Sequence, residues 1–183
     1  MHVNKDGVPP DKLNDPRLLA LEASMLSEMQ DPVFRLRSCA HEAAHAIYAR
    51  RAGFQKVDFY GPRIEWDSTL DKPIPLSGGI RESELINGTC DLALIAEIAV
   101  AGSVFEYTCD RGTAKNVETH DMAEFWAKAR KTDPGLTNEE IADYWRKAKN
   151  KVGKNLRRHP AVKAAIRKLA REYEAQLMND EAK

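Results

Sequence analysis

The arrangement of apolar residues along the chain predicts a protein built mostly from helices. Apolar side chains recur at helical spacing in six segments. Asp31 before Pro32 fits an N-cap followed by proline at the first helical position, and Thr137 with Glu140 has the spacing of a capping box. The expected helices cover residues 16–30, 32–52, 90–108 and 117–131, a segment that opens at Thr137, and a last segment that opens at Pro160.

Two short stretches have the composition of β-strands. Residues 56–64 (KVDFYGPRI) combine branched and aromatic side chains with a Gly-Pro break. Residues 76–83 (LSGGIRES) contain a Gly-Gly pair that would let another backbone approach closely. Residues 65–75 between them are expected to form a loop. The fold class predicted is therefore α+β, predominantly helical, with a small β-sheet or hairpin and a helical C-terminal part.

The ends of the chain differ in character from its middle. The first 17 residues contain three prolines and no apolar run, so residues 1–15 are expected to be disordered. Neither an internal repeat nor a Gly/Ser linker interrupts the remainder, which predicts one domain over residues 16–180. Within it, residues 137–180 are expected to form a basic helical segment.

Composition favours a protein of the cytoplasm that does not enter membranes. The N-terminus lacks the apolar core of a secretory signal, and the most apolar stretch, residues 92–105, contains Glu97, which indicates a buried core helix. Three cysteines are present and are widely spaced, so the sequence suggests no disulfide framework. A reducing cytoplasm is the compartment expected from this usage.

Charge is balanced over the whole chain but distributed unevenly. The net charge is zero, yet residues 146–183 hold 12 Lys/Arg against 4 Asp/Glu, and residues 146–171 hold eleven cations and no acid. Such a run could bind phosphates or an acidic partner. Because no base-reading motif accompanies it, a solvated helix face is favoured over nucleic-acid binding. Nothing in the sequence indicates an oligomeric state.

The segment CAHEAAHAIYAR (39–50) carries the motif with the clearest chemical meaning. Its His41 and His45 are four residues apart, so on a helix both can offer a ring nitrogen to one ion. Glu42 is turned about 100° from His41 and would stand beside the ion, where it can take a proton from water. The alternative is two ordinary helix histidines satisfied by neighbours. The surrounding alanines, which let other elements pack closely, favour a zinc (Zn²⁺) site.

Beyond this chemistry, the chain resembles a known family over residues 36–132. AHEAAHA (40–46) is similar to the AHEAGHA of FtsH-type zinc peptidases, the peptidase part of membrane-anchored AAA proteases. The further similarities, in the same order along the chain, are KVDFYGPR (56–63) with that family's strand and turn, LSGG (76–79) with its Gly-Gly edge strand, AGSVFE (101–106) with its G-G-R-A-A-E segment, and HDMAEFWAKAR (120–130) with its helix that carries a ligand aspartate.

The resemblance implies a zincin-like fold and a specific set of site residues. Zinc would be held by His41, His45 and Asp121, with Glu42 as general base. The implied activity is that of a zinc metallopeptidase, and without a nucleotide-binding loop it is expected to act independently of ATP on peptides or unfolded protein segments. The chain departs from the family where Ala44 replaces a glycine, where the Thr-Thr-Gly before the ligand helix is missing, and in having no G-x-x-x-x-G-K-[ST] nucleotide loop.

The third ligand has rivals when judged by chemistry alone. His120 is an excellent ligand type but points about 100° away from its neighbour Asp121. Glu97 and Glu106 are further candidates, and Glu97 is alternatively expected to orient one of the histidines. Asp121 is favoured because its spacing to Ala129-Arg130 matches the family.

The sequence supports one further hypothesis about substrate binding and two alternative functions. Residues 77–82 are expected to form an exposed edge strand near the metal that pairs with an extended substrate. A zinc-binding relative with a regulatory or binding role is the alternative to a peptidase. A nucleic-acid-associated protein with a structural zinc ion, acting through residues 146–171, is a second alternative.

Overall fold

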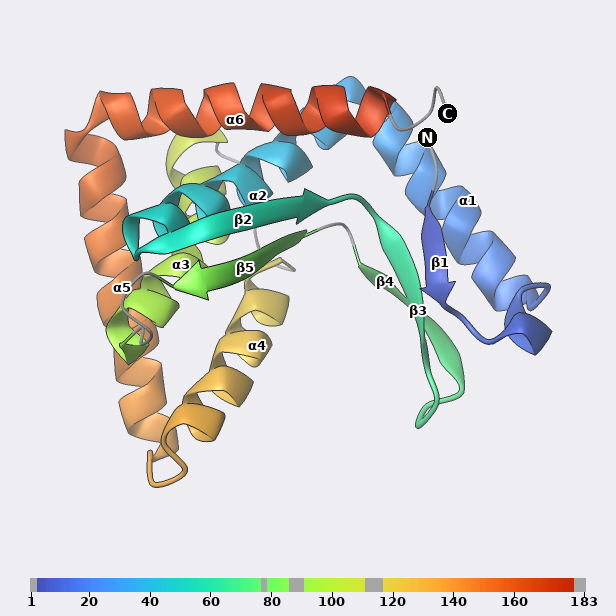
Figure 1. The fold of residues 1–183 in the computed structure, drawn as a ribbon, viewed down its shortest axis with the longest axis horizontal. Helices are drawn as coiled ribbons and strands as arrows, with labels where there is room; N and C mark the ends of the chain where they lie inside the picture. Colours follow the sequence, from blue (N-terminus) through green and yellow to red (C-terminus); the bar gives the residue numbers. More distant parts are fainter. Residues whose placement is uncertain (1–2, 77–78, 86–90, 111–116, 180–183) are drawn as a thin grey trace.

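The computed structural model describes residues 3–76, 79–85, 91–110 and 117–179, and these form a mostly helical protein, as predicted, with two small β-sheets (Figure 1). The elements in chain order are β1 (Asn4–Gly7), a 3-10 turn (Pro10–Lys12), α1 (Pro16–Gln30), α2 (Pro32–Arg51), β2 (Phe54–Tyr60), β3 (Arg63–Asp67), β4 (Lys72–Leu76), β5 (Gly79–Leu85), α3 (Leu92–Phe105), a π-helical turn (Glu106–Asp110), α4 (Val117–Thr132), α5 (Asn138–Arg158) and α6 (Pro160–Asn179).

The helix ends follow the capping residues seen in the sequence. Asp31 accepts a hydrogen bond from the backbone N–H of Val33 (2.8 Å) and so opens α2. Thr137 and Glu140 form both halves of the predicted capping box at the start of α5. The helix boundaries predicted for α1, α2 and α4 agree with the structure within one residue. At the starts of α1 and α2, the side chains of Asp15 and Asp31 accept hydrogen bonds from free backbone N–H groups.

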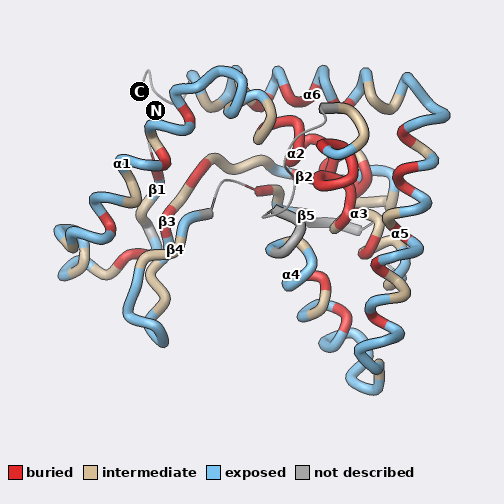
Figure 2. The backbone as a smooth tube through the Cα atoms, turned by 180° about the vertical axis from the view of Figure 1, so that it is seen from behind, coloured by how far each residue is buried: buried red, intermediate tan, exposed pale blue. Residues whose placement is uncertain are grey.

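Helix α2 runs through the centre of the larger hydrophobic core. It packs against α6 and α3, and α3 in turn packs against α5 and α4. Figure 2 shows that the buried residues concentrate where α2 and α3 meet. Ala43, Ala44 and Ala46 have no exposed surface, so their small size lets the neighbouring helices approach α2 closely.

Strands β2 and β5 pair antiparallel, from Phe54 opposite Leu85 to Tyr60 opposite Gly79. Within the described residues this sheet has two strands, and β5 lies between β2 and α4 (Figures 1 and 2). The strand predicted over 56–64 is split by Gly61-Pro62 into β2 and the start of β3. The predicted small sheet is therefore confirmed, but a second sheet accompanies it.

The expectation of a loop over residues 65–75 was wrong. Most of this segment belongs to a hairpin in which β3 pairs antiparallel with β4. The turn is held by Asp67, whose Oδ1 accepts hydrogen bonds from the N–H groups of Thr69 (2.8 Å) and Leu70 (3.1 Å). Pro73 and Pro75 make the sequence of β4 unlike that of a typical strand. β4 can contain them because it is an edge strand.

The expectation that residues 1–15 are disordered was also wrong over the described part of this segment. β1 pairs in parallel with β3, giving a three-stranded sheet of order β1-β3-β4. Val3 and Val8 are buried in a second, smaller cluster with Leu18, Met25 and Ile64. The local composition of residues 1–15 did not indicate that they are ordered. Their strand forms by pairing with residues about 60 positions further along the chain.

The chain thus folds around two hydrophobic clusters. We call the part formed by β1, α1, β3 and β4 the N-terminal unit. The chain passes between this unit and the remainder at Asp31-Pro32, between α1 and α2, at Gly61-Pro62, between β2 and β3, and between Leu76 of β4 and Gly79 of β5. Figure 1 shows the N-terminal unit standing beside the helical part.

The apolar and basic segments both lie on helices. Among the described residues one segment, Leu92–Cys109, is long and apolar enough to cross a membrane, and half of it is buried inside the structure. The basic run occupies α5 and α6, as expected, where Lys151 pairs with Glu97 (2.5 Å) and Lys147 with Asp143 (2.6 Å), while Arg157 is exposed. Nucleic-acid binding by this run stays an untested prediction.

Packing of the N-terminal unit can be tested at two adjacent leucines of α1. Leu18 is fully buried in the smaller cluster and Leu19 is 47% exposed. We expect Leu18→Ala to lower the free energy of unfolding by about 2–5 kcal/mol, because it leaves a cavity, and Leu19→Ala to change it by less than about 1 kcal/mol. Denaturant unfolding measures both values. Equal, small effects would show that this cluster does not stabilise the fold.

Candidate metal centre

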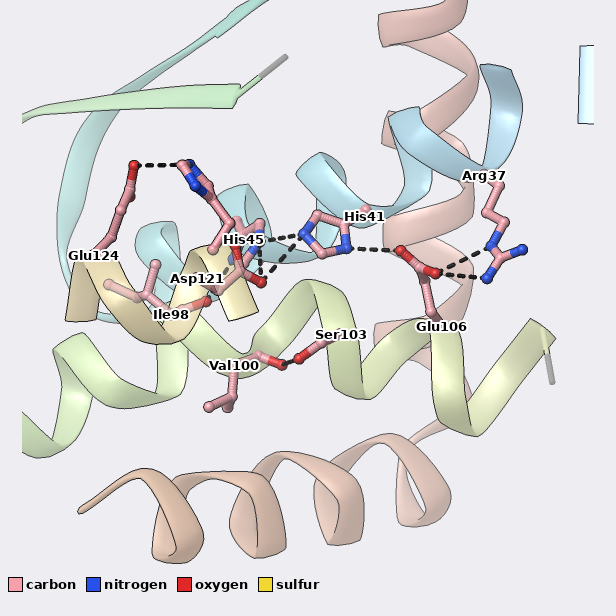
Figure 3. A network of polar contacts seen from close by, with 10 residues as sticks. Arg37, His41, His45, Ile98, Val100, Ser103, Glu106, Asp121 and Glu124 are labelled. Carbon is pink, nitrogen blue, oxygen red and sulfur yellow. Dashed lines mark hydrogen bonds and ion pairs between the residues drawn. The ribbon is translucent and has the colours of Figure 1, made fainter. Parts of the chain in front are cut away.

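Three side chains from two helices converge on one point. His41 and His45 come from α2, and Asp121 comes from the first turns of α4, 76 residues after His45. The Nε2 atoms of the two histidines are 2.9 Å apart, and Asp121 Oδ2 lies 3.4 Å from that of His41 and 3.6 Å from that of His45 (Figure 3). These three residues could hold a metal ion.

The spacing of the three atoms agrees with the size of a zinc site. Ligand atoms bound at 2.0–2.1 Å around a tetrahedral zinc ion are separated by about 3.3 Å from one another. The three separations observed here, 2.9, 3.4 and 3.6 Å, lie around that value. One ion placed between the atoms would therefore be coordinated by all three without a large rearrangement.

Hydrogen bonds on the far side of each ring orient the histidines. His45 Nδ1 lies 2.7 Å from the carbonyl oxygen of Ile98, which can only accept, so Nδ1 carries the proton and Nε2 presents a lone pair. His41 Nδ1 lies 2.8 Å from Glu106 Oε1, which gives the same tautomer when the carboxylate is ionised. Both Nε2 lone pairs then face each other and the carboxylate of Asp121.

Such a cluster of electron-rich atoms needs a cation. Asp121 Oδ2 is buried and has no hydrogen-bond partner among the described residues. Burial by itself lowers the pKa of His41, but the carboxylates of Asp121 and Glu106 outweigh it and raise that pKa to about 10. Burial likewise raises the pKa of Asp121, but the neighbouring imidazoles outweigh it and the net pKa is lowered. A proton and a metal ion would compete for the same atoms.

Glu106 is in turn held by Arg37 of α2. The guanidinium donates from Nε and Nη2 to Glu106 Oε2, at 3.0 and 2.9 Å (Figure 3). Burial raises the pKa of Glu106, but the contacts with His41 and Arg37 outweigh it and the net pKa is lowered. Arg37 therefore keeps the Glu106 carboxylate ionised and in contact with the buried imidazole of His41.

The orienting carboxylate is not the one expected. Glu97 was the candidate, but it pairs with Lys151 of α5. Nine residues separate Glu97 from Glu106, which is two and a half helical turns, so the two carboxylates lie on opposite faces of α3 and its continuation. Glu106, weighed as a third ligand, contacts the far nitrogen of His41 instead of the shared point.

A glycine makes room for the first histidine. A Cβ atom built on Gly102 would lie 2.5 Å from Cε1 and Nε2 of His41, a distance that no side chain tolerates. The missing side chain therefore lets the His41 ring lie directly against α3. Gly102 belongs to the segment AGSVFE, in which no local sequence signal indicates this steric role.

Glu42 stands beside His41, His45 and Asp121, which we call the metal-binding group. All four residues line one cavity. It is buried, at 7% exposure, and burial raises its pKa against the opposing effect of the two imidazoles. A carboxylate whose pKa lies above its usual range is a better proton acceptor at neutral pH. Its position fits the general base expected from the motif.

His120 takes a different place from its neighbour Asp121. Its side chain is 61% exposed, and its Nε2 lies 3.3 Å from Glu124 Oε1, one turn further along α4. It contributes to the rim of the cavity, while Asp121 reaches the histidines. The two adjacent residues thus point apart, as helix geometry requires.

The metal-binding group lies in a cavity of about 610 Å³ that opens to solvent. Side chains of α2, α3, α4, β2 and β5 line it together with side chains of the N-terminal unit. Its lining mixes apolar residues with charged ones, among them Glu28, Arg63 and Lys128. The lining residues that matter below are Met25, Met29, Phe34, His41, Glu42, His45, Gly79, Ile80, His120, Asp121 and Glu124.

Comparisons with known proteins assign the chain to no family. The chain matches no model of a known protein family and no curated protein. The chemistry of the site and the resemblance of short motifs therefore carry the functional argument.

Zinc binding should separate Asp121 from His120. We expect Asp121→Ala to lose most of the bound zinc, because two imidazoles alone hold the ion weakly, and His120→Ala to retain it. Zinc per chain, measured by metal analysis after dialysis, gives the answer, with circular dichroism as the control for folding. Loss of zinc in His120→Ala alone would reassign the third ligand.

Zinc affinity should also report on Glu106. We expect Glu106→Gln to weaken zinc binding by about 10–100-fold, because the amide no longer fixes the His41 tautomer as an ionised carboxylate does. Glu97→Gln on the same helix is the matched control and should bind zinc like the unaltered protein. Competition with a chromophoric chelator measures both affinities. Equal affinities for the two variants would remove Glu106 from the metal centre.

Proposed function

We propose that the chain is an ATP-independent zinc metallopeptidase with a zincin-like active site. The observation that carries the proposal is the convergence of His41, His45 and Asp121 in an open cavity beside the buried Glu42. The motif resemblance to FtsH-type zinc peptidases supports the same assignment of residues.

The number of ligands favours a catalytic over a structural zinc site. Structural zinc ions are usually closed by four protein ligands, whereas catalytic ones have three and keep one position for water or substrate. Three candidate ligands converge here among the described residues, and they face the cavity. Two imidazoles and one carboxylate form a common ligand set of zinc hydrolases.

The roles of the protein's own groups follow from their positions. A bound zinc ion would polarise the scissile carbonyl and acidify the attacking water. Glu42 takes the proton from that water and returns it to the leaving amine, and its raised pKa suits both transfers. Glu106 and the carbonyl of Ile98 keep the imidazole rings oriented by binding their Nδ1–H groups.

Strand β5 is the proposed docking edge for an extended substrate. Gly79 and Ile80 line the same cavity as the two histidines, which supports placing this strand beside the substrate. β5 pairs with β2 along one edge, which leaves its other edge, among the described residues, available for strand addition. Ser77 and Gly78 of the expected segment lie outside the described residues. A substrate bound this way is a peptide or an unfolded segment.

Hydrolysis should depend on Glu42 while zinc binding should not. We expect Glu42→Gln to keep one zinc ion per chain and to lower the cleavage rate of unfolded casein by at least about 100-fold, because the group that transfers the proton is lost. Glu124→Gln, at the cavity rim, is the matched carboxylate control. Release of new amino termini measures the rate.

Two outcomes would contradict the proposal. Equal cleavage by the unaltered protein and Glu42→Gln would show that another group acts as base. A zinc-loaded, folded protein that cleaves neither casein nor short peptides would favour the alternative, a zinc-binding module with a regulatory role.

A further inference from the structure

The cavity around the metal-binding group has a second wall that the peptidase chemistry does not use. Glu28 of α1 and Arg63 of β3 line the cavity on this side. The apolar part of the wall comes from Met25 and Met29 of α1 and Phe34 at the start of α2. All three lie outside residues 36–132, the part of the chain that resembles the zinc peptidases. The inference below rests on the proposed metal site and names what this wall recognises.

Phe34 stands in a defined relation to the histidines. It precedes His41 by seven residues and His45 by eleven, and both spacings return to the same face of a helix within about 20°. Seven residues of helix rise about 10.5 Å, which equals the length of about three residues of extended peptide. A peptide lying along this face with one carbonyl at the metal would bring a side chain about three residues away to Phe34.

The two methionines face the same space from α1. They are four residues apart, so they share one face of α1, and both are largely buried, at 7% and 3% exposure. Phe34 is 38% exposed. Unbranched methionine side chains adapt to apolar groups of different shape, and the aromatic ring adds a large apolar surface.

The wall is fixed to the metal-binding helix. Arg35 of α2 donates from Nη1 to the carbonyl oxygen of Met29 at 2.9 Å, and Asp31 is at once the residue after α1 and the N-cap of α2. The side chain of Met25 also belongs to the smaller hydrophobic cluster. The end of α1 is therefore held against the start of α2.

We propose that Met25, Met29 and Phe34 form a subsite that selects an apolar side chain about three residues from the scissile bond of an extended peptide. The N-terminal unit is then the specificity element of the enzyme. An uncharged polar side chain at that position would lose its hydration against these three apolar side chains and would bind more weakly.

Peptide hydroxamates test the subsite without requiring hydrolysis, because the hydroxamate anchors the probe on zinc. Two short peptides are compared that differ only in the third residue from the hydroxamate, Leu in one and Ser in the other. Each is made with the hydroxamate at either end, so that both chain directions are sampled. Calorimetry on zinc-loaded protein gives the two affinities. We expect the Leu probe to bind about tenfold more tightly in one direction.

Phe34→Ala should reduce this preference to about threefold or less, because the exposed aromatic surface is removed. Leu36→Ala is the matched control, since Leu36 has the same 38% exposure on the same helix but does not line the cavity. It should keep the full preference. Because Phe34 is only partly buried, its loss should leave the fold and the zinc content intact, and both are measured.

The outcomes separate this inference from the proposed function. Equal affinity for the Leu and Ser probes, a preference that survives Phe34→Ala, or failure of both probes to bind the zinc-loaded protein would each overturn the subsite. A Leu preference that depends on Phe34 in a protein that cleaves nothing would sustain the subsite and refute the peptidase.

Discussion

Two imidazole nitrogens held 2.9 Å apart, with a buried carboxylate oxygen against both, are the constraint on which the site depends. Lone pairs in this arrangement repel one another unless a cation lies between them. The surrounding structure keeps the arrangement in place. Glu106 and the Ile98 carbonyl bind the outer ring nitrogens, and Gly102 leaves space for a ring where any other residue would collide with it.

Helix α2 connects the chemistry to the rest of the molecule. Its alanines allow close packing by neighbouring helices, and one of its faces carries the two histidines. Its first turn carries Phe34 and meets the end of α1, so the N-terminal unit is attached at one end of the metal-binding face. A change in the packing of α1 against α2 would therefore alter the cavity wall, while the metal-binding atoms on α2 and α4 would stay in position.

The helical part of the fold could be read from the sequence because its signals are local. Caps such as Asp31 and Thr137 act within three residues, and helical apolar spacing needs no distant partner. The β1 strand and the β3–β4 hairpin could not be predicted in the same way. Their residues are polar or proline-rich, and their order comes from pairing between β1 and β3 across most of the N-terminal half of the chain.

The sequence by itself determined that His41 and His45 share one helix face and that Glu42 stands beside them, because helix geometry sets those relations within five residues. Only the tertiary structure decided that Asp121 reaches the shared point while His120 stays at the rim, and that Glu106 instead of Glu97 orients the first ring. It also decided that Met25 and Met29 face the same cavity. The physical reason is that these contacts join helices whose separation in space depends on how α1, α3 and α4 pack on α2, and no local pattern of residues contains that information.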